Sequence, residues 1–187
     1  MGYLMKREAA LSLVKQQVKN RNLIKHMLAV EAIMRALATR LGQDVEQWGL
    51  AGLLHDIDYD KTADDPEQHS LLGANMLAEA GVAPQIVDAV KVHNEVHGLP
   101  RLSLLDKALY AADPLSGLIV AAALIHPERK LAAIDVQFVS KRFDEKSFAR
   151  GASREQIESC QDLGLSLEHF LALSLQAMKA ISTDLGL

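Results

Sequence analysis

This sequence of 187 residues has little cysteine, few aromatic residues and only a small net charge. Cys160 is the only cysteine, which excludes an intramolecular disulfide framework and any zinc cluster built from several thiolates. Aromatic residues make up 4% of the chain, which favours helices packed by aliphatic side chains over a β-sandwich. The formal net charge of -4 provides no general attraction to nucleic acid or to anionic membranes. Any phosphate binding must therefore come from a local site.

Long hydrophobic runs are also absent. The most apolar stretch, residues 115–125, is too short to span a bilayer. Residues 1–7 lack the basic segment and following apolar run of a secretory signal. With 49% hydrophobic and 24% charged residues, the chain has the composition of a globular protein. The sequence predicts a cytoplasmic protein that binds no membrane.

Apolar residues recur at helical spacing along most of the chain, and no strand-like alternation persists over several residues, so we predict an all-α fold. Glycine, proline and capping residues mark where these helices begin and end. An irregular segment is expected at residues 130–154. The expected helices cover about residues 4–18, 23–41, 45–54, 65–81 with an Asp65-Pro66 cap, 84–97, 102–112, a short one after Ser153, and 166–186.

Histidine and aspartate side chains fall on helix faces that should be buried. His26 and His93 each share a face with apolar residues of their helices, and His55 and Asp56 end an apolar helix. One such histidine alone is usually a hydrogen-bonded core residue. Several buried polar groups cost a few kcal/mol each unless they are paired, and a shared cation would pair them all. Imidazole and carboxylate ligands suit Fe, Mn, Zn, Ni or Co, so we expect one or two divalent transition metals.

The order of these residues resembles the HD superfamily of metal-dependent phosphohydrolases. The motifs AGLLHDI at 51–57 and YAAD at 110–113 carry the resemblance, which covers about residues 23–113. The whole chain is similar to a bacterial group of predicted HD hydrolases with no assigned substrate, through DPLSGL at 113–118 and KSFA at 146–149. The resemblance implies metal ligands at His26, His55, Asp56 and Asp113, and at His69 and His93 as in dinuclear branches of the superfamily.

The resemblance also implies an organisation and an activity. We expect one HD-type helical bundle over residues 1–187, with a metal-site core at about 23–113 and a C-terminal helical extension at about 114–187. The expected reaction is hydrolysis of a nucleotide or related small phosphate ester by a metal-bound water or hydroxide. A non-catalytic module that senses nucleotides or metals is the alternative. We expect no nucleic-acid polymer as a partner, and the sequence leaves the oligomeric state open.

Further roles follow with alternatives left open. Asp113 precedes Pro114, a pattern that could also make it an N-cap. We interpret Asp56 as the bridging catalytic carboxylate and Asp58 as a general acid or base, although such loop carboxylates are more often solvated. Many relatives carry Gly and Lys soon after the His-Asp pair, where this chain has IDYDK at 57–61. The predicted substrate contacts are Lys61, His97, Lys141, Arg142 and Lys146.

Overall fold

The computed structural model describes residues 5–187, and among these residues every regular element is a helix. The predicted all-α fold is therefore confirmed. Residues 1–4, which include Leu4 of the expected first helix and part of the segment inspected for a signal, lie outside the described residues. The helices are α1 (Arg7–Gln17), α2 (Arg21–Leu41), α3 (Val45–Leu54), α4 (Tyr59–Thr62), α5 (Leu71–Glu79), α6 (Pro84–His93), α7 (Leu104–Ile125), α8 (Val136–Asp144), α9 (Arg154–Glu158), α10 (Leu167–Ala180) and α11 (Ser182–Leu185), with 3-10 turns η1 (Glu95–His97), η2 (Leu131–Ala133) and η3 (Ser159–Leu163).

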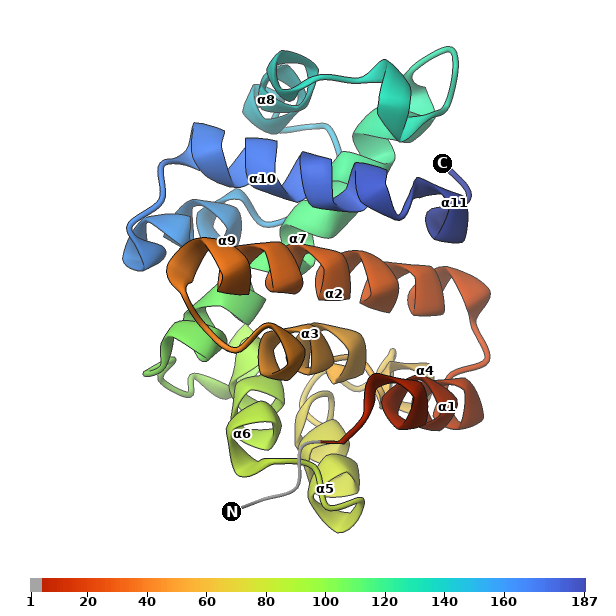
Figure 1. Cartoon of the computed structure of the whole chain (residues 1–187), viewed down its shortest axis with the longest axis vertical. Helices are drawn as coiled ribbons and strands as arrows, with labels where there is room; N and C mark the ends of the chain where they lie inside the picture. The colour runs from red at the N-terminus through yellow and green to blue at the C-terminus, as the bar shows by residue number, and fades with distance from the viewer. Residues whose placement is uncertain (1–4) are drawn as a thin grey trace.

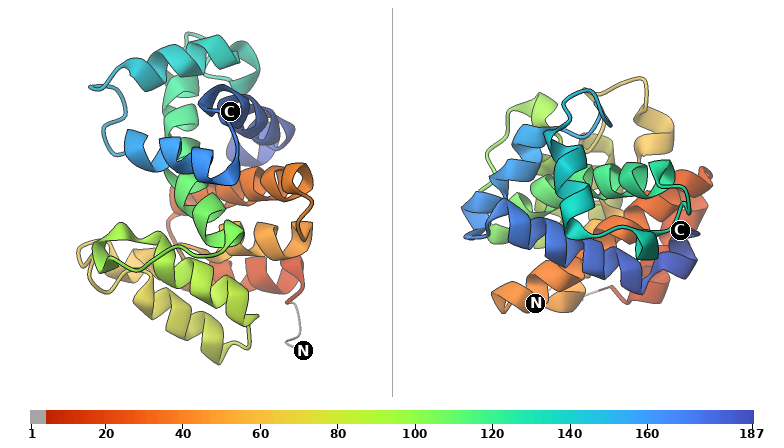
Figure 2. Two further views of the ribbon diagram at one scale, coloured as in Figure 1. Left: turned by 90° about the vertical axis from the view of Figure 1, so that its left-hand side faces the viewer. Right: turned by 90° about the horizontal axis from the view of Figure 1, so that it is seen from above.

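The central helix α7 connects two groups of helices (Figure 1). It packs against α2, α3 and α6 and also against α8, α9 and α10. The left view of Figure 2 shows the same division from a second side, with α5 and α6 at one end of the molecule and α8 at the other. The predicted boundary between residues 113 and 114 lies inside this continuous helix. The division into a core and an extension therefore stays a prediction.

Helices α2 and α3 approach each other closely because glycine lies between them. A Cβ atom at Gly52 would lie 2.8 Å from the Cα atom of Glu31, a separation that real Cβ atoms essentially never show. The buried Glu31 carboxylate accepts hydrogen bonds from Arg7 Nε at 2.6 Å and from Arg35 Nε at 2.9 Å. This ionic contact ties α1 to α2 and satisfies a charge that would otherwise be costly to bury.

The expected end of a helix at Ala112 was wrong, because α7 is 22 residues long and continues through Pro114 to Ile125. Proline has no N–H to donate to the carbonyl one turn earlier, which usually ends or kinks a helix. Here twelve residues of α7 are buried, and this packing outweighs the lost hydrogen bond. The Ser116 hydroxyl donates to the Asp113 carbonyl at 2.9 Å. Asp113 is therefore inside a helix, and the alternative role as an N-cap is wrong.

Helix α7 is long and apolar enough to cross a membrane by length and composition. More than half of its most apolar window, 56%, is buried inside the protein, and it carries the carboxylates of Asp106 and Asp113. Within residues 5–187 it is the one helix that meets these criteria. Its burial is that of a helix in the core of a protein.

The expected start of helix α5 at Asp65-Pro66 was also wrong. Residues 66–70 form turns, and α5 begins at Leu71 after Ser70, whose φ of 73° is left-handed. The reason lies outside the segment, because the carboxylate of Asp58 accepts the backbone N–H groups of Ser70 and Gly73, both at 2.8 Å. A distant side chain caps this helix, which a local sequence pattern cannot show.

The segment expected to be irregular contains α8 and a turn that one arginine organises. The Arg154 guanidinium donates to backbone carbonyls on either side of this turn, at 2.7–3.2 Å. Arginine offers five N–H donors in a rigid fork, so a single side chain can satisfy many carbonyls. The six accepting carbonyls belong to Arg142, Phe143, Glu145, Phe148, Ala149 and Ala152.

Candidate metal centre

Asp56 lies at the centre of the predicted site, between two pairs of imidazoles. Its Oδ2 atom lies 3.4 Å from Nε2 of His26 and 3.4 Å from Nε2 of His55. Its Oδ1 atom lies 3.5 Å from Nε2 of His69 and 3.6 Å from Nε2 of His93. One carboxylate therefore faces four imidazoles, two on each of its oxygens, which is the arrangement expected of a bridge between two cations.

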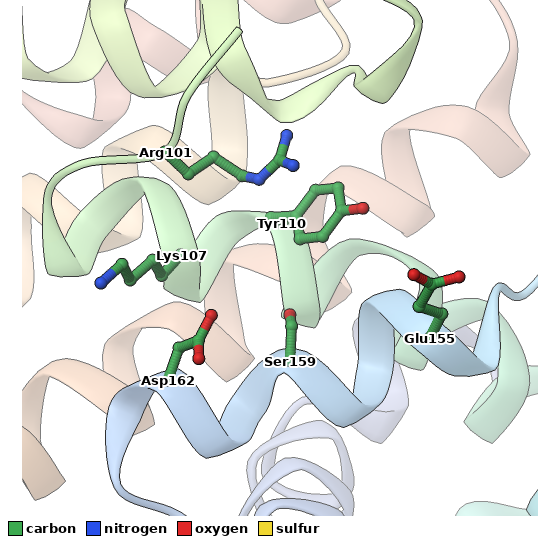
Figure 3. A pocket seen from close by; sticks show the side chains of 6 residues that line it. All are labelled: Arg101, Lys107, Tyr110, Glu155, Ser159 and Asp162. Atoms are coloured by element: carbon green, nitrogen blue, oxygen red, sulfur yellow. The ribbon is translucent and has the colours of Figure 1, made fainter. Parts of the chain in front are cut away.

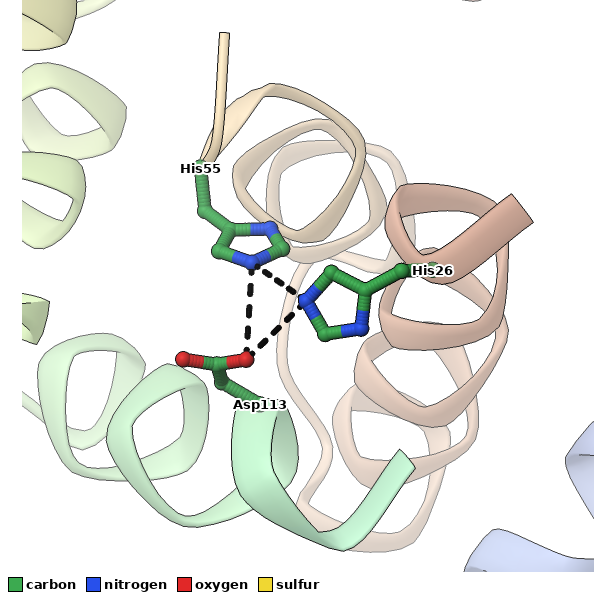
Figure 4. Close-up of side chains that lie close together, drawn as sticks. All are labelled: His26, His55 and Asp113. Carbon is green, nitrogen blue, oxygen red and sulfur yellow. Dashed lines mark hydrogen bonds and ion pairs between the residues drawn. The ribbon is translucent and has the colours of Figure 1, made fainter. Parts of the chain in front are cut away.

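Asp113 completes the first pair. Its Oδ1 atom lies 3.0 Å from His26 Nε2 and 3.6 Å from His55 Nε2, and the two imidazole nitrogens are 3.1 Å apart (Figure 4). These residues come from α2, from the end of α3 and from the middle of α7, so three helices converge on this point. His55, Asp56 and His93 form a second group with metal-ligand spacing. The structure thus brings all six predicted ligands together.

Two of the four imidazoles are oriented by the helices that carry them. Nδ1 of His55 donates to the carbonyl of Gly52 at 2.8 Å, and Nδ1 of His93 donates to the carbonyl of Val90 at 2.6 Å. Because Nδ1 carries the proton in each ring, Nε2 presents a lone pair. Histidines that bind metals are commonly oriented by a hydrogen bond of this kind on the other nitrogen.

The other two imidazoles are oriented by side chains. His26 Nδ1 lies 2.9 Å from the Ser116 hydroxyl, which gives its own proton to the Asp113 carbonyl and so accepts from the imidazole. His69 Nδ1 donates to Oδ1 of Asp58 at 3.0 Å. All four rings therefore direct Nε2 toward Asp56, where this nitrogen can bind a cation once it carries no proton.

This donor set fits a divalent cation. The Nε2 atoms of His26 and His55 lie 3.1 Å apart, so either a proton on one of them or a cation between them must occupy this contact. Nε2 of His93 is buried and has no hydrogen-bond partner among the described residues. Cations on the two sides of Asp56 would satisfy these nitrogens, and imidazole with carboxylate is the ligand chemistry of first-row transition metals.

The pKa values of the histidines and aspartates at this site also favour a positive charge between them. Burial alone would lower the pKa of His26, but its hydrogen bonds with Asp113 and Asp56 outweigh burial and raise the pKa to about 9. Burial also opposes the charged form of His55, yet the neighbouring Asp56 and Asp113 raise its pKa well above the usual value. Burial would raise the pKa of Asp56, and the surrounding histidines instead hold it well below its usual range. The carboxylates stay ionised and hold protons on the imidazoles unless a metal replaces them.

Asp58 occupies a different position from the one predicted. It is fully buried, and its Oδ1 accepts from His69 while its Oδ2 accepts from the backbone N–H groups of Ser70 and Gly73. It lies against the Nδ1 side of His69, whereas Asp56 faces the Nε2 side. This placement is that of a residue that positions a metal ligand, and it does not support the predicted acid–base role.

The predicted substrate contacts are also placed elsewhere. Nε2 of His97 donates to the His69 carbonyl at 2.8 Å, so it supports the ligand segment. Lys61 donates to Gln17 at 2.8 Å and is exposed on α4. The remaining three lie on α8 and the turn after it, which pack on α7 and α10 at the other end of the molecule from α6 (Figure 1). Of these, Lys141 and Lys146 are exposed and Arg142 pairs with Glu145 at 2.8 Å.

Sequence reasoning missed two residues that contact the ligands. Ser116 is a buried hydroxyl in an apolar helix, three residues after Asp113, and that spacing places both on neighbouring faces of the helix. Tyr59 packs edge-on against His69, with ring centroids 5.0 Å apart, and remains 40% exposed. The position of Ser116 was available as a signal, because a buried polar residue near a predicted ligand needs a partner.

Comparison with known proteins agrees with this geometry. The HD domain family matches residues 23–123, which is more than half of the chain, and the chain belongs to this family. Ribonuclease Y of Geotalea uraniireducens (strain Rf4) is 29% identical over 169 residues, which are 89% of this chain and 32% of the relative. Ribonuclease Y of Geobacter sulfurreducens is 30% identical over 169 residues, again 89% of this chain and 32% of the relative. Ribonuclease Y of Nitratidesulfovibrio vulgaris (strain DP4) is 33% identical over 98 residues, 52% of this chain and 18% of the relative. The chain spans at most about a third of the length of these relatives.

These relatives correct one expectation. We expected no nucleic-acid polymer as a partner, and the relatives are named as ribonucleases, whose substrate is RNA. The expectation rested on the net charge of -4, which excludes only a general attraction to polyanions. It omitted bound cations, which are often the largest local charges in a site and can attract phosphate to an acidic protein.

Proposed function

We propose that this chain is a metal-dependent phosphohydrolase that cleaves a phosphate ester bond in a ribonucleotide substrate. The observation that carries the proposal is the position of Asp56, whose two oxygens face two separate pairs of imidazoles. Membership of the HD family supports hydrolysis, and the ribonucleases among its relatives support a ribonucleotide.

Each residue of the centre has a role in this proposal. His26, His55 and Asp113 would hold one divalent cation, His69 and His93 a second, and Asp56 would join the two. Such cations polarise a phosphoryl oxygen and lower the pKa of bound water from about 15.7 toward about 7. The identity of the metal is open among Fe, Mn, Zn, Ni and Co.

The exposure of the side chains around the site indicates from which side a substrate would enter. The Asp113 and His26 side chains are 31% and 25% exposed, whereas His55 and Asp56 are 0% and 9% exposed. A phosphate therefore approaches past Asp113 and His26 and meets the buried bridge from one side. Water adds its oxygen to phosphorus, the bond to the leaving oxygen breaks, and the water proton ends on that leaving group.

Replacement of the bridge tests the proposal. We expect Asp56→Ala to lose most of its metal, measured by elemental analysis, and to lower hydrolysis by more than about a thousandfold. The screen would offer nucleotides, dinucleotides and short RNA with Mn, Fe, Co, Ni or Zn. Asp60→Ala is the matched control, because Asp60 lies nearby in the sequence, on α4, and its carboxylate accepts hydrogen bonds from the backbone N–H groups of Lys19 and Asn20. Full activity of Asp56→Ala would reject the proposal, and tight nucleotide binding by the wild type without any turnover would favour a sensor.

We also propose that the protein acts in the cytoplasm. The apolar helix α7 is occupied in the core, and the single cysteine, Cys160, is a buried free thiol that needs no oxidising compartment. Fractionation of cells that produce the tagged protein tests this location, and recovery in the membrane pellet would contradict it.

A further inference from the structure

Helix α7 has one accessible stripe beside the metal centre. Between residues 105 and 117, the positions that are not buried are 107, 110, 113, 114 and 117, and the rest are buried. These positions lie three or four residues apart, so they share one face of the helix. Asp113 on this stripe belongs to the metal centre, and Tyr110 precedes it by about one turn, or roughly 4.5 Å along the axis. The stripe thus leads from the metal centre toward Tyr110 and Lys107.

A cavity of about 340 Å³ opens along this stripe. Figure 3 shows α7 on one side of it and the α9–η3 segment on the other, with the side chains from both directed into the space between. Its volume is within the range of pockets that bind small ligands. The residues that line it are Arg101, Lys107, Tyr110, Glu155, Ser159 and Asp162.

One wall of this cavity is a stacked pair of side chains. The guanidinium carbon of Arg101 lies 3.8 Å from the centre of the Tyr110 ring. Arg101 Nη1 donates to the Val92 carbonyl at 3.3 Å, and the Tyr110 hydroxyl donates to Glu95 at 3.1 Å. Both anchors flank His93, so the segment that carries a predicted metal ligand also fixes this pair.

We propose that this cavity, the Tyr110 cavity, holds the nucleobase of a substrate whose phosphate lies at the metal centre. This inference rests on the proposed function and specifies which part of the substrate is recognised. Planar tyrosine and guanidinium groups are the side chains on which bases stack in single-stranded RNA.

The charges of the Tyr110 cavity favour a base over a second phosphate. Arg101 and Lys107 are balanced by Glu155 and Asp162 on the opposite wall, so the cavity has no net positive charge to attract an anion. The two carboxylates are instead acceptors for the amino groups of adenine, guanine or cytosine. The phosphate of the same nucleotide, attached through the ribose, would bind the cations of the metal centre, about one turn further along α7.

Calorimetry on the full chain loaded with Mn²⁺ tests the inference with two probes that resist hydrolysis. These are the 5′-phosphonate analogues of adenosine and of base-free ribose, which differ only in the base. We expect the adenosine analogue to bind at least about tenfold more tightly, the range for stacking of one base. Tyr110→Ala should remove this preference, and Tyr110→Phe should retain it because the ring remains.

The matched control uses a second arginine–aromatic pair, at the other end of the molecule. Arg142 lies over Phe138 on α8 with 5.2 Å to the ring centre, so Phe138→Leu should leave the preference for adenosine intact. Equal binding of both probes by the wild type would overturn the inference, as would an equal loss of both in Tyr110→Ala. A wild type that prefers the adenosine analogue but hydrolyses no phosphate ester would reject the proposed function alone. Hydrolysis without any preference for a base would reject the Tyr110 cavity alone.

Discussion

The metal centre and the turn around Arg154 both bring polar groups together inside the protein. Only around Arg154 do these groups all find hydrogen-bond partners among the described residues. Around Arg154, one cation meets six backbone carbonyls, so every donor has an acceptor. Around Asp56, the Nε2 atoms of four imidazoles face two carboxylates, and Nε2 of His93 has no hydrogen-bond partner within the described residues. A polar cluster that pairs internally indicates structure, whereas one that leaves inward-facing atoms unmatched indicates a ligand.

The largest effect should come from the self-contained region. We expect Arg154→Met to lower the free energy of unfolding by about 2–4 kcal/mol, because six partly buried carbonyls lose a hydrogen bond at once, and only those of Glu145 and Ala149 also accept a backbone N–H in this turn. Denaturant unfolding measures this change. Arg150→Met, at an exposed neighbour, should change it by less than about 0.5 kcal/mol. Metal content per folded molecule should stay the same in both, and a fall in Arg154→Met would show that the two regions are not independent.

An intermediate effect should appear at the second ligand pair. We expect Asp58→Asn to weaken metal binding about 10- to 100-fold, because the amide no longer holds the Nδ1 proton of His69 as a carboxylate does. Competition with a chelator of known affinity measures the change. Asp60→Asn is the control, since Asp60 also accepts two backbone N–H groups but contacts no metal ligand. If the two variants bind metal alike, Asp58 has no role in positioning His69.

The smallest effect concerns pH. In the metal-free protein the pKa of His26 is raised to about 9 from an ordinary value of 6.5, so its contribution to stability is complete below pH 6.5 and is lost as pH rises through 9. We expect the melting temperature to fall by about 2–4 °C over this range, or roughly 1 kcal/mol. His55 contributes in the same direction.

Metal should reverse this dependence. A bound cation replaces the imidazole protons, so its affinity should rise over the same pH range. Calorimetric scans with and without metal measure both trends. A metal-free protein whose stability increases from pH 6.5 to 9 would contradict the assignment, and His26→Gln should reduce the slope.

Local helical patterns were sufficient to predict the all-α fold, whereas the full set of converging residues was predicted from the resemblance to the HD superfamily. Gly42 ends α2 with a φ of 66°, Pro84 begins α6, and Ser166 caps α10, all as predicted. The histidines and aspartates stood on apolar helix faces, which is itself a sign of an internal site. Their use as metal ligands stays a prediction until metal is measured.

What failed depended on contacts between distant segments. The start of α5 moved to Leu71 because Asp58 caps it from another loop, and α7 continued through Pro114 because neighbours bury it. The basic residues around Lys141 were assigned to the substrate on charge alone, and the fold places α8 away from the ligands. Charge and local propensity do not specify which end of a helical protein a segment will occupy.

Gly52 has no side chain, yet it affects the geometry of the candidate metal centre through the separation of α2 and α3. Since a methyl group there would collide with the backbone of Glu31, the side chain's absence fixes how near two helices come. That spacing also determines how close the imidazoles of His26 on α2 and His55 at the end of α3 lie to each other. A substitution that widened this contact would therefore separate the predicted ligands while leaving each of them in place.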